Sequence, residues 1–216
     1  MARIAKLASL VMGFGFVGSL AVAQGSYHGY EAPSYTVERQ VGAAELRIYA
    51  PHMLAEVTVQ GDQGQAVGLG FRVLAGYIFG GNTSSTDAAM TVPVAQRPSE
   101  QIAMTVPVAQ SGTAQDWVIS FMMPAQYSRD TLPVPKDDRV RFVETTPQRQ
   151  LVLQFSGRAG QSQLDAQTNT LRQIAAEGGI MLGAGPSFYF YDDPFTLPWN
   201  RRNEVAFVVA SDEAGQ

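Results

Sequence analysis

The order of periodic segments most strongly constrains what this chain can fold into. Stretches in which apolar and polar residues alternate surround two segments with the period of an amphipathic helix. Met53–Gln60, the first helix and Trp117–Met123 parallel Gln150–Ser156, the second helix and Glu204–Val209. This repeated order predicts an α+β domain with a curved antiparallel sheet, two helices outside it and an internal duplication. The other expected strands are Tyr35–Arg39, Glu45–Tyr49, Ile102–Val108, Arg139–Glu144 and Phe188–Asp192.

The two helices have recognisable ends. The first is expected between Asp62, a good N-cap, and Phe79, because Gly80-Gly81 follows as a stop. The second is expected over Gln163–Glu177 with Ser162 as its N-cap. The predicted inward residues are Val67, Phe71, Leu74 and Ile78 in the first helix, and Leu164, Leu171, Ile174 and Ala175 in the second.

An octapeptide, Ala-Met-Thr-Val-Pro-Val-Ala-Gln, occurs at both Ala89–Gln96 and Ala103–Gln110. Proline cannot donate to a β-ladder, so Pro93 and Pro107 are expected at a strand end, an edge or a bulge. Two identical segments compete for one place in a sheet. We therefore expect one copy to pair in the sheet and the other to form a hairpin arm or a covering loop. The repeat is interpreted as a structural duplication without chemistry of its own.

The first 23 residues have the pattern of a signal peptide. Arg3 and Lys6 precede a mostly apolar run, and Ala21-Val22-Ala23 offers small residues for cleavage. The mature chain, residues 24–216, is then a single domain in the periplasm or outside the cell, with no further membrane span. An uncleaved membrane tether is the alternative.

Composition excludes several function classes. The chain has no cysteine, which excludes disulfides, thiolate metal sites, iron–sulfur clusters and covalently attached c-type haem. A net charge of −4 without a basic run gives nucleic-acid binding no electrostatic support. With only two histidines, neither a Cys–His pair nor a convincing Ser–His–Asp triad can be assembled. The chain is therefore predicted to bind a ligand rather than to act as an enzyme.

An ordered set of short motifs runs from about residue 30 to residue 209. The motifs are Tyr30-Glu31-Ala32-Pro33 with Tyr35-Thr36-Val37, Glu45-Leu46-Arg47-Ile48-Tyr49, Tyr77-Ile78-Phe79-Gly80-Gly81-Asn82, the Met-Thr-Val-Pro-Val repeat, Trp117–Pro124, Phe155-Ser156-Gly157 and Pro198–Val205. This set resembles the SOUL haem-binding family. The resemblance implies a distorted antiparallel β-barrel with two flanking helices and pseudo-twofold symmetry. It also implies non-enzymatic, non-covalent binding of haem or a related tetrapyrrole, for scavenging, buffering or transport.

Candidates for an axial iron ligand are few. Some members of the SOUL family carry a histidine within the Glu-x-Arg-x-Tyr strand, but that position is Ile48 here and cannot coordinate iron. His52, at the turn before Met53–Gln60, is the predicted metal ligand, although an exposed turn histidine is the simpler interpretation. His28 is expected to be an exposed residue near the mature N-terminus.

A pocket is expected against the first helix and the adjacent strands. Arg72 beside the apolar stripe is predicted to meet a haem propionate, or else a nearby carboxylate. Met104 and Met122 are predicted to form a soft pocket wall, and core packing is the alternative for both. The full predicted site is His52, Val67, Phe71, Arg72, Leu74, Ile78, Met104, Met122, Tyr189 and Tyr191, in which the tyrosines stack on the macrocycle or ligate through their phenols. Arg201 and Arg202 are instead expected to hold the backbone of the last loop.

Two other functions remain open from the sequence. The duplicated architecture also resembles the effector-binding domains of bacterial regulators, which implies a pocket for cationic or amphipathic molecules. The chain is alternatively an envelope protein whose partner is another protein, with the spare copy of the octapeptide as an exposed strand.

Overall fold

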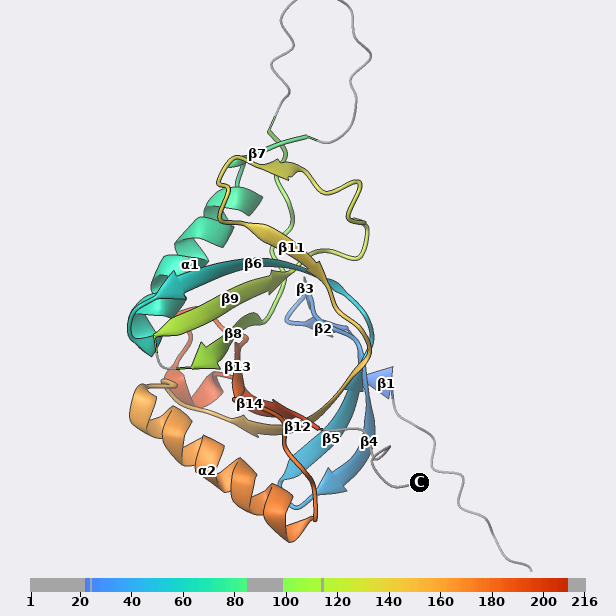
Figure 1. The fold of residues 1–216 in the computed structure, drawn as a ribbon, viewed down its shortest axis with the longest axis vertical. Coiled ribbons are helices and arrows are strands. Elements are labelled where there is room, and N and C mark those ends of the chain that lie inside the picture. Colours follow the sequence, from blue (N-terminus) through green and yellow to red (C-terminus); the bar gives the residue numbers. More distant parts are fainter. Residues whose placement is uncertain (1–21, 24, 85–98, 114, 210–216) are drawn as a thin grey trace, which may run out of the picture.

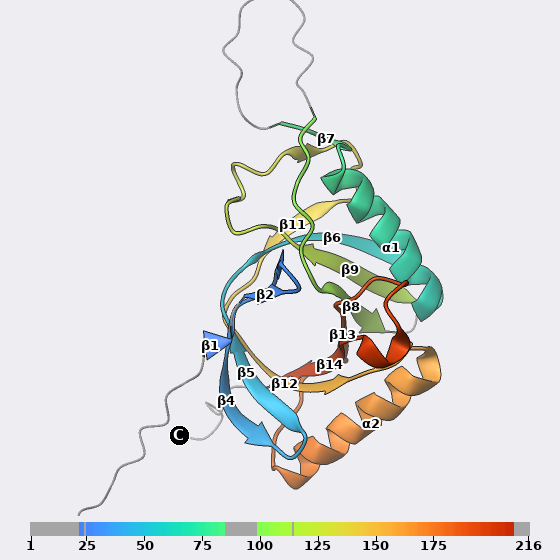
Figure 2. The same cartoon turned by 180° about the vertical axis from the view of Figure 1, so that it is seen from behind.

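The computed structural model describes residues 22–23, 25–84, 99–113 and 115–209, and a ten-stranded sheet dominates it. The sheet order is β1-β4-β5-β12-β14-β13-β8-β9-β6-β11, and every neighbouring pair is antiparallel. Figures 1 and 2 show the sheet curled into a barrel-like shape with both helices on one side of it. The strands of the sheet are β1 (Val22–Ala23), β4 (Tyr35–Val41), β5 (Ala44–Tyr49), β6 (Met53–Gln60), β8 (Val108–Thr113), β9 (Asp116–Met122), β11 (Arg141–Glu144), β12 (Gln148–Phe155), β13 (Ser187–Phe190) and β14 (Asn203–Val208).

The remaining elements lie around this sheet. A small hairpin, β2 (Ser26–Tyr27) with β3 (Tyr30–Glu31), packs near the concave face, and β7 (Asn82–Thr83) pairs with β10 (Val134–Pro135). The helices are α1 (Gln63–Ile78) and α2 (Gln161–Glu177), with a short 3-10 helix, η1 (Pro198–Asn200), before β14. Among the described residues, no helix is long and apolar enough to cross a membrane.

The predicted internal duplication is confirmed by the strand order. The sheet order reads β12-β14-β13 and then β8-β9-β6, so it is symmetric about the β13–β8 pair. This symmetry equates β6, α1, β8 and β9 with β12, α2, β13 and β14 in chain order. The fold class predicted from the sequence, an α+β curved antiparallel sheet with two flanking helices, is therefore correct.

The two faces of the sheet have different chemistry. The face toward the helices is apolar and carries the main core, including Leu46, Ile119, Leu151 and Val205. Because side chains alternate along a strand, the intervening residues of β5, β12 and β14 point to the concave face. That face carries buried tyrosines together with the ion pairs and hydrogen bonds described below.

Helix α1 begins and ends as predicted. The Asp62 carboxylate accepts the backbone N–H of Gln65 at 2.9 Å, and the helix ends at Ile78 with Phe79 as its C-cap. Gly80 has a φ of +108°, and Gly81 N–H donates to the Gly76 carbonyl at 2.8 Å, the bond expected of a Schellman stop. The predicted N-cap of the second helix is wrong. The helix starts at Gln161 and its N-cap is Gly160, which provides no side-chain acceptor.

The predicted strand Ile102–Val108 is wrong, because β8 begins only at Val108. Pro107 has no N–H to donate to a ladder, so regular pairing starts after it. Before that point the chain bonds to other elements: Ile102 N–H donates to the Ile78 carbonyl and Val106 N–H to the Glu31 carbonyl, both at 2.9 Å. The first copy of the octapeptide, Ala89–Gln96, lies outside the described residues.

Strand β1 consists of the last two residues of the predicted signal peptide. Val22 and Ala23 pair with Thr36 and Tyr35 at the edge of β4. Cleavage after residue 23, which stays a prediction, would remove β1 and leave β4 as the edge of the sheet.

Gly70 sets how closely α1 approaches the sheet. A Cβ atom built at Gly70 would overlap the Cβ and Cγ1 atoms of Ile119 on β9, whereas a Cβ at Gly76 meets nothing within 4 Å. We expect Gly70→Ala to lower the free energy of unfolding by about 1–3 kcal/mol because it overpacks the contact between helix and sheet. Gly76→Ala, the matched control, should raise it by up to about 1 kcal/mol through helix propensity. Urea unfolding measures both values, and equal effects of the two substitutions would contradict this view of the interface.

Candidate ligand-binding site

A cavity of about 1160 Å³ lies where the first turns of α1 and α2 face the octapeptide segment, the β2–β3 hairpin and the loop before β14. Its volume is slightly above the range of about 300–1,000 Å³ that is usual for small-molecule pockets. The apolar part of its wall comprises Val67, Phe71, Met104, Val106, Leu164 and Phe190. The cavity is thus an apolar space large enough for a sizeable organic ligand.

Both helices point their N-termini at this cavity. Asp62, Gln63 and Gly64 line it at the start of α1, and Gly160 and Gln161 line it at the start of α2. At the first helix the Asp62 carboxylate already accepts the N–H of Gln65, whereas the second helix has no side-chain cap. The helix dipole and the lack of a side-chain cap make the α2 end the more favourable position for a negatively charged group of a ligand.

The β2–β3 hairpin borders the cavity with Tyr27, His28 and Tyr30. The hydroxyl of Tyr27 donates to Asp192 at 3.2 Å, and the Tyr27 ring meets the Tyr191 ring at 5.2 Å between centroids. Burial, followed by the nearby Asp192 carboxylate, raises the pKa of Tyr27. These contacts hold the hairpin against a loop that is distant in the sequence.

A buried charge network supports the wall beneath Tyr191. Glu204 on β14 has no exposed surface, and its carboxylate accepts from Arg47 at 3.0 Å, Arg202 at 2.6 Å and the Tyr191 hydroxyl at 3.1 Å. Burial is the largest single effect and acts to lower the pKa of Arg47, but Glu204, Tyr49 and Tyr35 together outweigh it and raise that pKa. Burial and then Glu204 raise the pKa of Tyr191, so its phenol stays protonated.

Three further residues complete the network. Arg47 donates to Glu45 at 2.7 Å and to the Tyr49 hydroxyl at 3.1 Å, and it lies over the ring of Tyr35, 4.3 Å from its centroid. The Glu-x-Arg-x-Tyr motif and the Asn-Glu motif of β14 therefore meet in one buried cluster.

The loop before β14 is tightly hydrogen-bonded. Arg201 donates to the carbonyls of Thr196 at 2.7 Å and Pro194 at 2.5 Å, which confirms that this arginine holds loop backbone. The Asp193 carboxylate accepts the N–H groups of Phe195 at 2.7 Å and Thr196 at 3.0 Å. Arg202 has a different role from the one predicted, because its guanidinium joins the buried network and lies 4.2 Å from the centroid of Tyr191. The sequence alone could not show that Glu204 is buried.

Four of the predicted site residues line the cavity: Val67, Phe71, Met104 and Tyr191. Leu74 and Ile78 lie in the main core instead, fully covered by the sheet. Met122 is buried on β9, outside the cavity wall. Tyr189 is partly buried on the concave face, where its hydroxyl donates to Gln150 at 2.9 Å and burial raises its pKa to about 12.

His52 and Arg72 are also outside the cavity wall. His52 Nδ1 lies 2.9 Å from the Ala50 carbonyl and 3.3 Å from the Thr145 hydroxyl, and burial lowers the pKa of its ring. Arg72 Nε donates weakly to the Gly68 carbonyl at 3.4 Å on the exposed side of α1. Ile48, the position of the family histidine, is partly exposed and likewise does not line the cavity.

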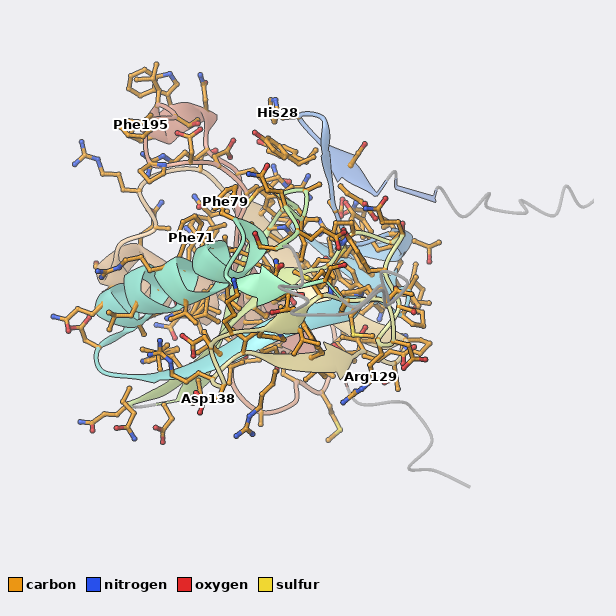
Figure 3. All side chains as sticks on the ribbon, turned by 90° about the horizontal axis from the view of Figure 1, so that it is seen from above. His28, Phe71, Phe79, Arg129, Asp138 and Phe195 are labelled. Carbon is orange, nitrogen blue, oxygen red and sulfur yellow. The ribbon has the colours of Figure 1, made fainter. Side chains whose placement is uncertain are left out.

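His28 is the residue that reasoning from the sequence missed. It is exposed, as predicted, but it lies on the cavity rim rather than in a loose terminus. In Figure 3 His28 and Phe195 project from the same side of the molecule, one on the hairpin and one on the loop. The only signal in the sequence was the spacing of Tyr27, His28-Gly29 and Tyr30, which is typical of a two-residue hairpin turn. In the described part of the chain, no group of three or more His, Cys, Asp or Glu residues forms a potential metal site.

A family model and a relative of known name are similar to this chain. A family model described as SOUL heme-binding protein matches residues 30–208. Heme-binding protein 1 of Sus scrofa is 31% identical over 137 residues, which is 62% of this chain and 66% of that relative, just under two thirds of its length.

Solved structures share the fold at low identity. The C-terminal domain of EcmrR is 10% identical with a TM-score of 0.57, over 78% of this chain and 97% of that domain. A hydrolase from Listeria innocua is 13% identical with a TM-score of 0.51, over 80% of this chain and 94% of that protein. At such identities the likeness shows the fold alone.

Breaking the buried network should lower the free energy of unfolding. We expect Glu204→Gln to lower the free energy of unfolding by about 3–5 kcal/mol, because Arg47 and Arg202 then lose their shared buried counter-charge. Arg139→Gln is the control, since the ion pair between Arg139 and Asp137 is on the surface and its loss should be barely measurable in urea unfolding. If both variants unfold like the wild-type protein, Glu204 does not support this wall.

Proposed function

This chain belongs to the SOUL haem-binding protein family, and on that premise we propose that it binds haem or a related tetrapyrrole in the cavity between the two helix N-termini. The observation that supports this location best is the apolar wall built by Val67, Phe71, Met104 and Leu164. Family membership supports non-covalent haem binding, and the absence of cysteine is consistent with it.

The residues around the cavity suit the parts of such a ligand. Haem contributes a flat apolar ring, two carboxylates and an iron atom. Apolar surface removed from water contributes roughly 25 cal/mol per Å², so the ring would supply most of the affinity. Arg158 and Arg201 at the cavity edge, together with the uncapped N-terminus of α2, offer positive charge for the carboxylates.

Binding without catalysis fits the state of the acidic residues at the cavity. Asp62 caps α1, Asp192 accepts from Tyr27 and from Arg202 N–H, and Asp193 holds the turn at Phe195 and Thr196. Each of these carboxylates already has a structural role, so none is presented as a base beside a nucleophile. We therefore assign the cavity to reversible binding.

We also propose a location and a physiological role from the signal-like N-terminus. Export would place the domain in the periplasm or outside the cell, where it would scavenge, buffer or transport haem. The net charge of −4 gives no electrostatic basis for a nucleic-acid partner in that role.

The buried network disfavours a cationic effector as the ligand. Glu204, the most deeply buried carboxylate near the cavity, is already paired with Arg47 and Arg202. A cation would have to displace two arginines to reach it. The protein-interaction alternative depends on residues 89–96, which lie outside the described residues, and stays untested.

Filling the cavity tests its role directly. Gly68 lines the cavity and a Cβ there meets nothing within 4 Å, so Gly68→Leu should fold normally and occupy ligand space. We expect it to weaken hemin binding at least about tenfold, equivalent to ~1.4 kcal/mol. Absorption titration of the purified protein with hemin measures this change.

Gly76→Leu is the matched control on the same helix. Gly76 is equally open but lies outside the cavity wall, so this variant should keep the affinity of the wild-type protein. Equal affinities of the Gly68 variant and the wild-type protein would place the ligand elsewhere, and unsaturable uptake by the wild-type protein would contradict the proposed function itself.

A further inference from the structure

We infer that His28, at the tip of the β2–β3 hairpin, is the side chain that ligates the haem iron, an inference that rests on the proposed function. Both histidines of the chain lie in the described residues, and only His28 lines the cavity. Imidazole is a common axial ligand of haem iron, and the chain has no cysteine to provide a thiolate.

Apart from Tyr30, which is exposed beside His28 on the same hairpin, the tyrosines and the methionine around the cavity are engaged elsewhere. The Tyr27 hydroxyl donates to Asp192 and the Tyr191 hydroxyl to Glu204. The thioether of Met104 packs against the main core, where it serves the cavity wall.

The imidazole of His28 has no competing structural role. Within residues 22–23, 25–84, 99–113 and 115–209, neither ring nitrogen has a hydrogen-bond partner, and the ring only meets the Tyr27 ring edge-on at 4.2 Å between centroids. His52, in contrast, has its Nδ1 atom beside a backbone carbonyl and a hydroxyl. The side chain of His28 is therefore available to a ligand in the cavity.

The backbone at this turn has the conformation of a tight hairpin. His28 has a φ of +50° and Gly29 a φ of +85°, the combination of a two-residue type I′ turn. Asn and Gly are the usual residues at the first position of such a turn, and histidine is among the residues that tolerate a positive φ.

The hairpin that carries His28 is fixed at its base. Ala32 N–H donates to the Gly25 carbonyl at 2.7 Å, and Val106 N–H donates to the Glu31 carbonyl at 2.9 Å. Together with the bond between Tyr27 and Asp192, these contacts hold the turn at the cavity rim. An imidazole on a fixed rim loses little conformational freedom when it binds iron.

The decisive variant is His28→Asn, because asparagine accepts a positive φ and preserves the turn while it removes the imidazole. We expect the variant to unfold like the wild-type protein. Its hemin complex should lose the absorption and electron paramagnetic resonance features of an imidazole-ligated ferric iron, and added free imidazole should restore them. His52→Asn is the matched control and should leave the spectra of the complex unchanged.

Metal-free protoporphyrin IX separates ligation from packing. Without iron there is nothing for His28 to ligate, so His28→Asn should weaken hemin binding and leave the affinity for protoporphyrin IX unchanged. Equal loss for both ligands, or unchanged spectra of the His28 variant, would overturn the assignment of His28 while the proposed function stands. Failure of the wild-type protein to bind either macrocycle saturably would instead overturn the proposed function.

Discussion

A buried carboxylate at the centre of the concave face determines how the parts of this protein fit together. Glu204 has no exposed surface, so its charge is tolerable only because Arg47, Arg202 and Tyr191 surround it. Arg47 lies on β5, Arg202 is two residues before Glu204, and Tyr191 directly follows β13. The network therefore fixes β5, β13 and β14 relative to one another. It also sets the position of Tyr191, on which the Tyr27 ring and the β2–β3 hairpin rest.

The duplication explains why the cavity lies where it does. Equivalent strands meet at the β13–β8 pair, and the two equivalent helices consequently direct their first turns toward the same space. The halves differ in how they use it. The first half closes its helix N-terminus with Asp62 and links Gln63 to Gln110 at 2.9 Å, whereas the second half leaves Gly160 without a capping side chain. At the α1 end of the cavity the helix N-terminus is thus capped by the protein itself. The α2 end remains favourable for an anionic group of a ligand.

The sequence predicted the elements whose signals are local. Asp62 and Gly80-Gly81 set the ends of α1, and alternation located most strands within two residues. The site was only partly predictable. The apolar stripe of α1 divides in the structure, with Leu74 and Ile78 in the core and Val67 and Phe71 at the cavity, because the helix meets the sheet most closely at Gly70. Because glycine has no side chain, the hydrophobic pattern of the sequence does not show that this close contact lies at Gly70. His28 was missed because its position depends on a bond between Tyr27 and Asp192, which are 165 residues apart.

An iron-ligating side chain on a hairpin turn is held differently from one on a strand. A residue at the position of Ile48 is held by the ladders that join β5 to β4 and β12, so its position is independent of the ligand. His28 is held by a two-residue turn that is anchored through Tyr27, Glu31 and Ala32. Iron coordination by His28 would therefore depend on the contacts that hold the hairpin in place. Contacts that hold the hairpin in place, such as the one between Tyr27 and Asp192, would then contribute to the affinity for the iron-containing ligand without touching it.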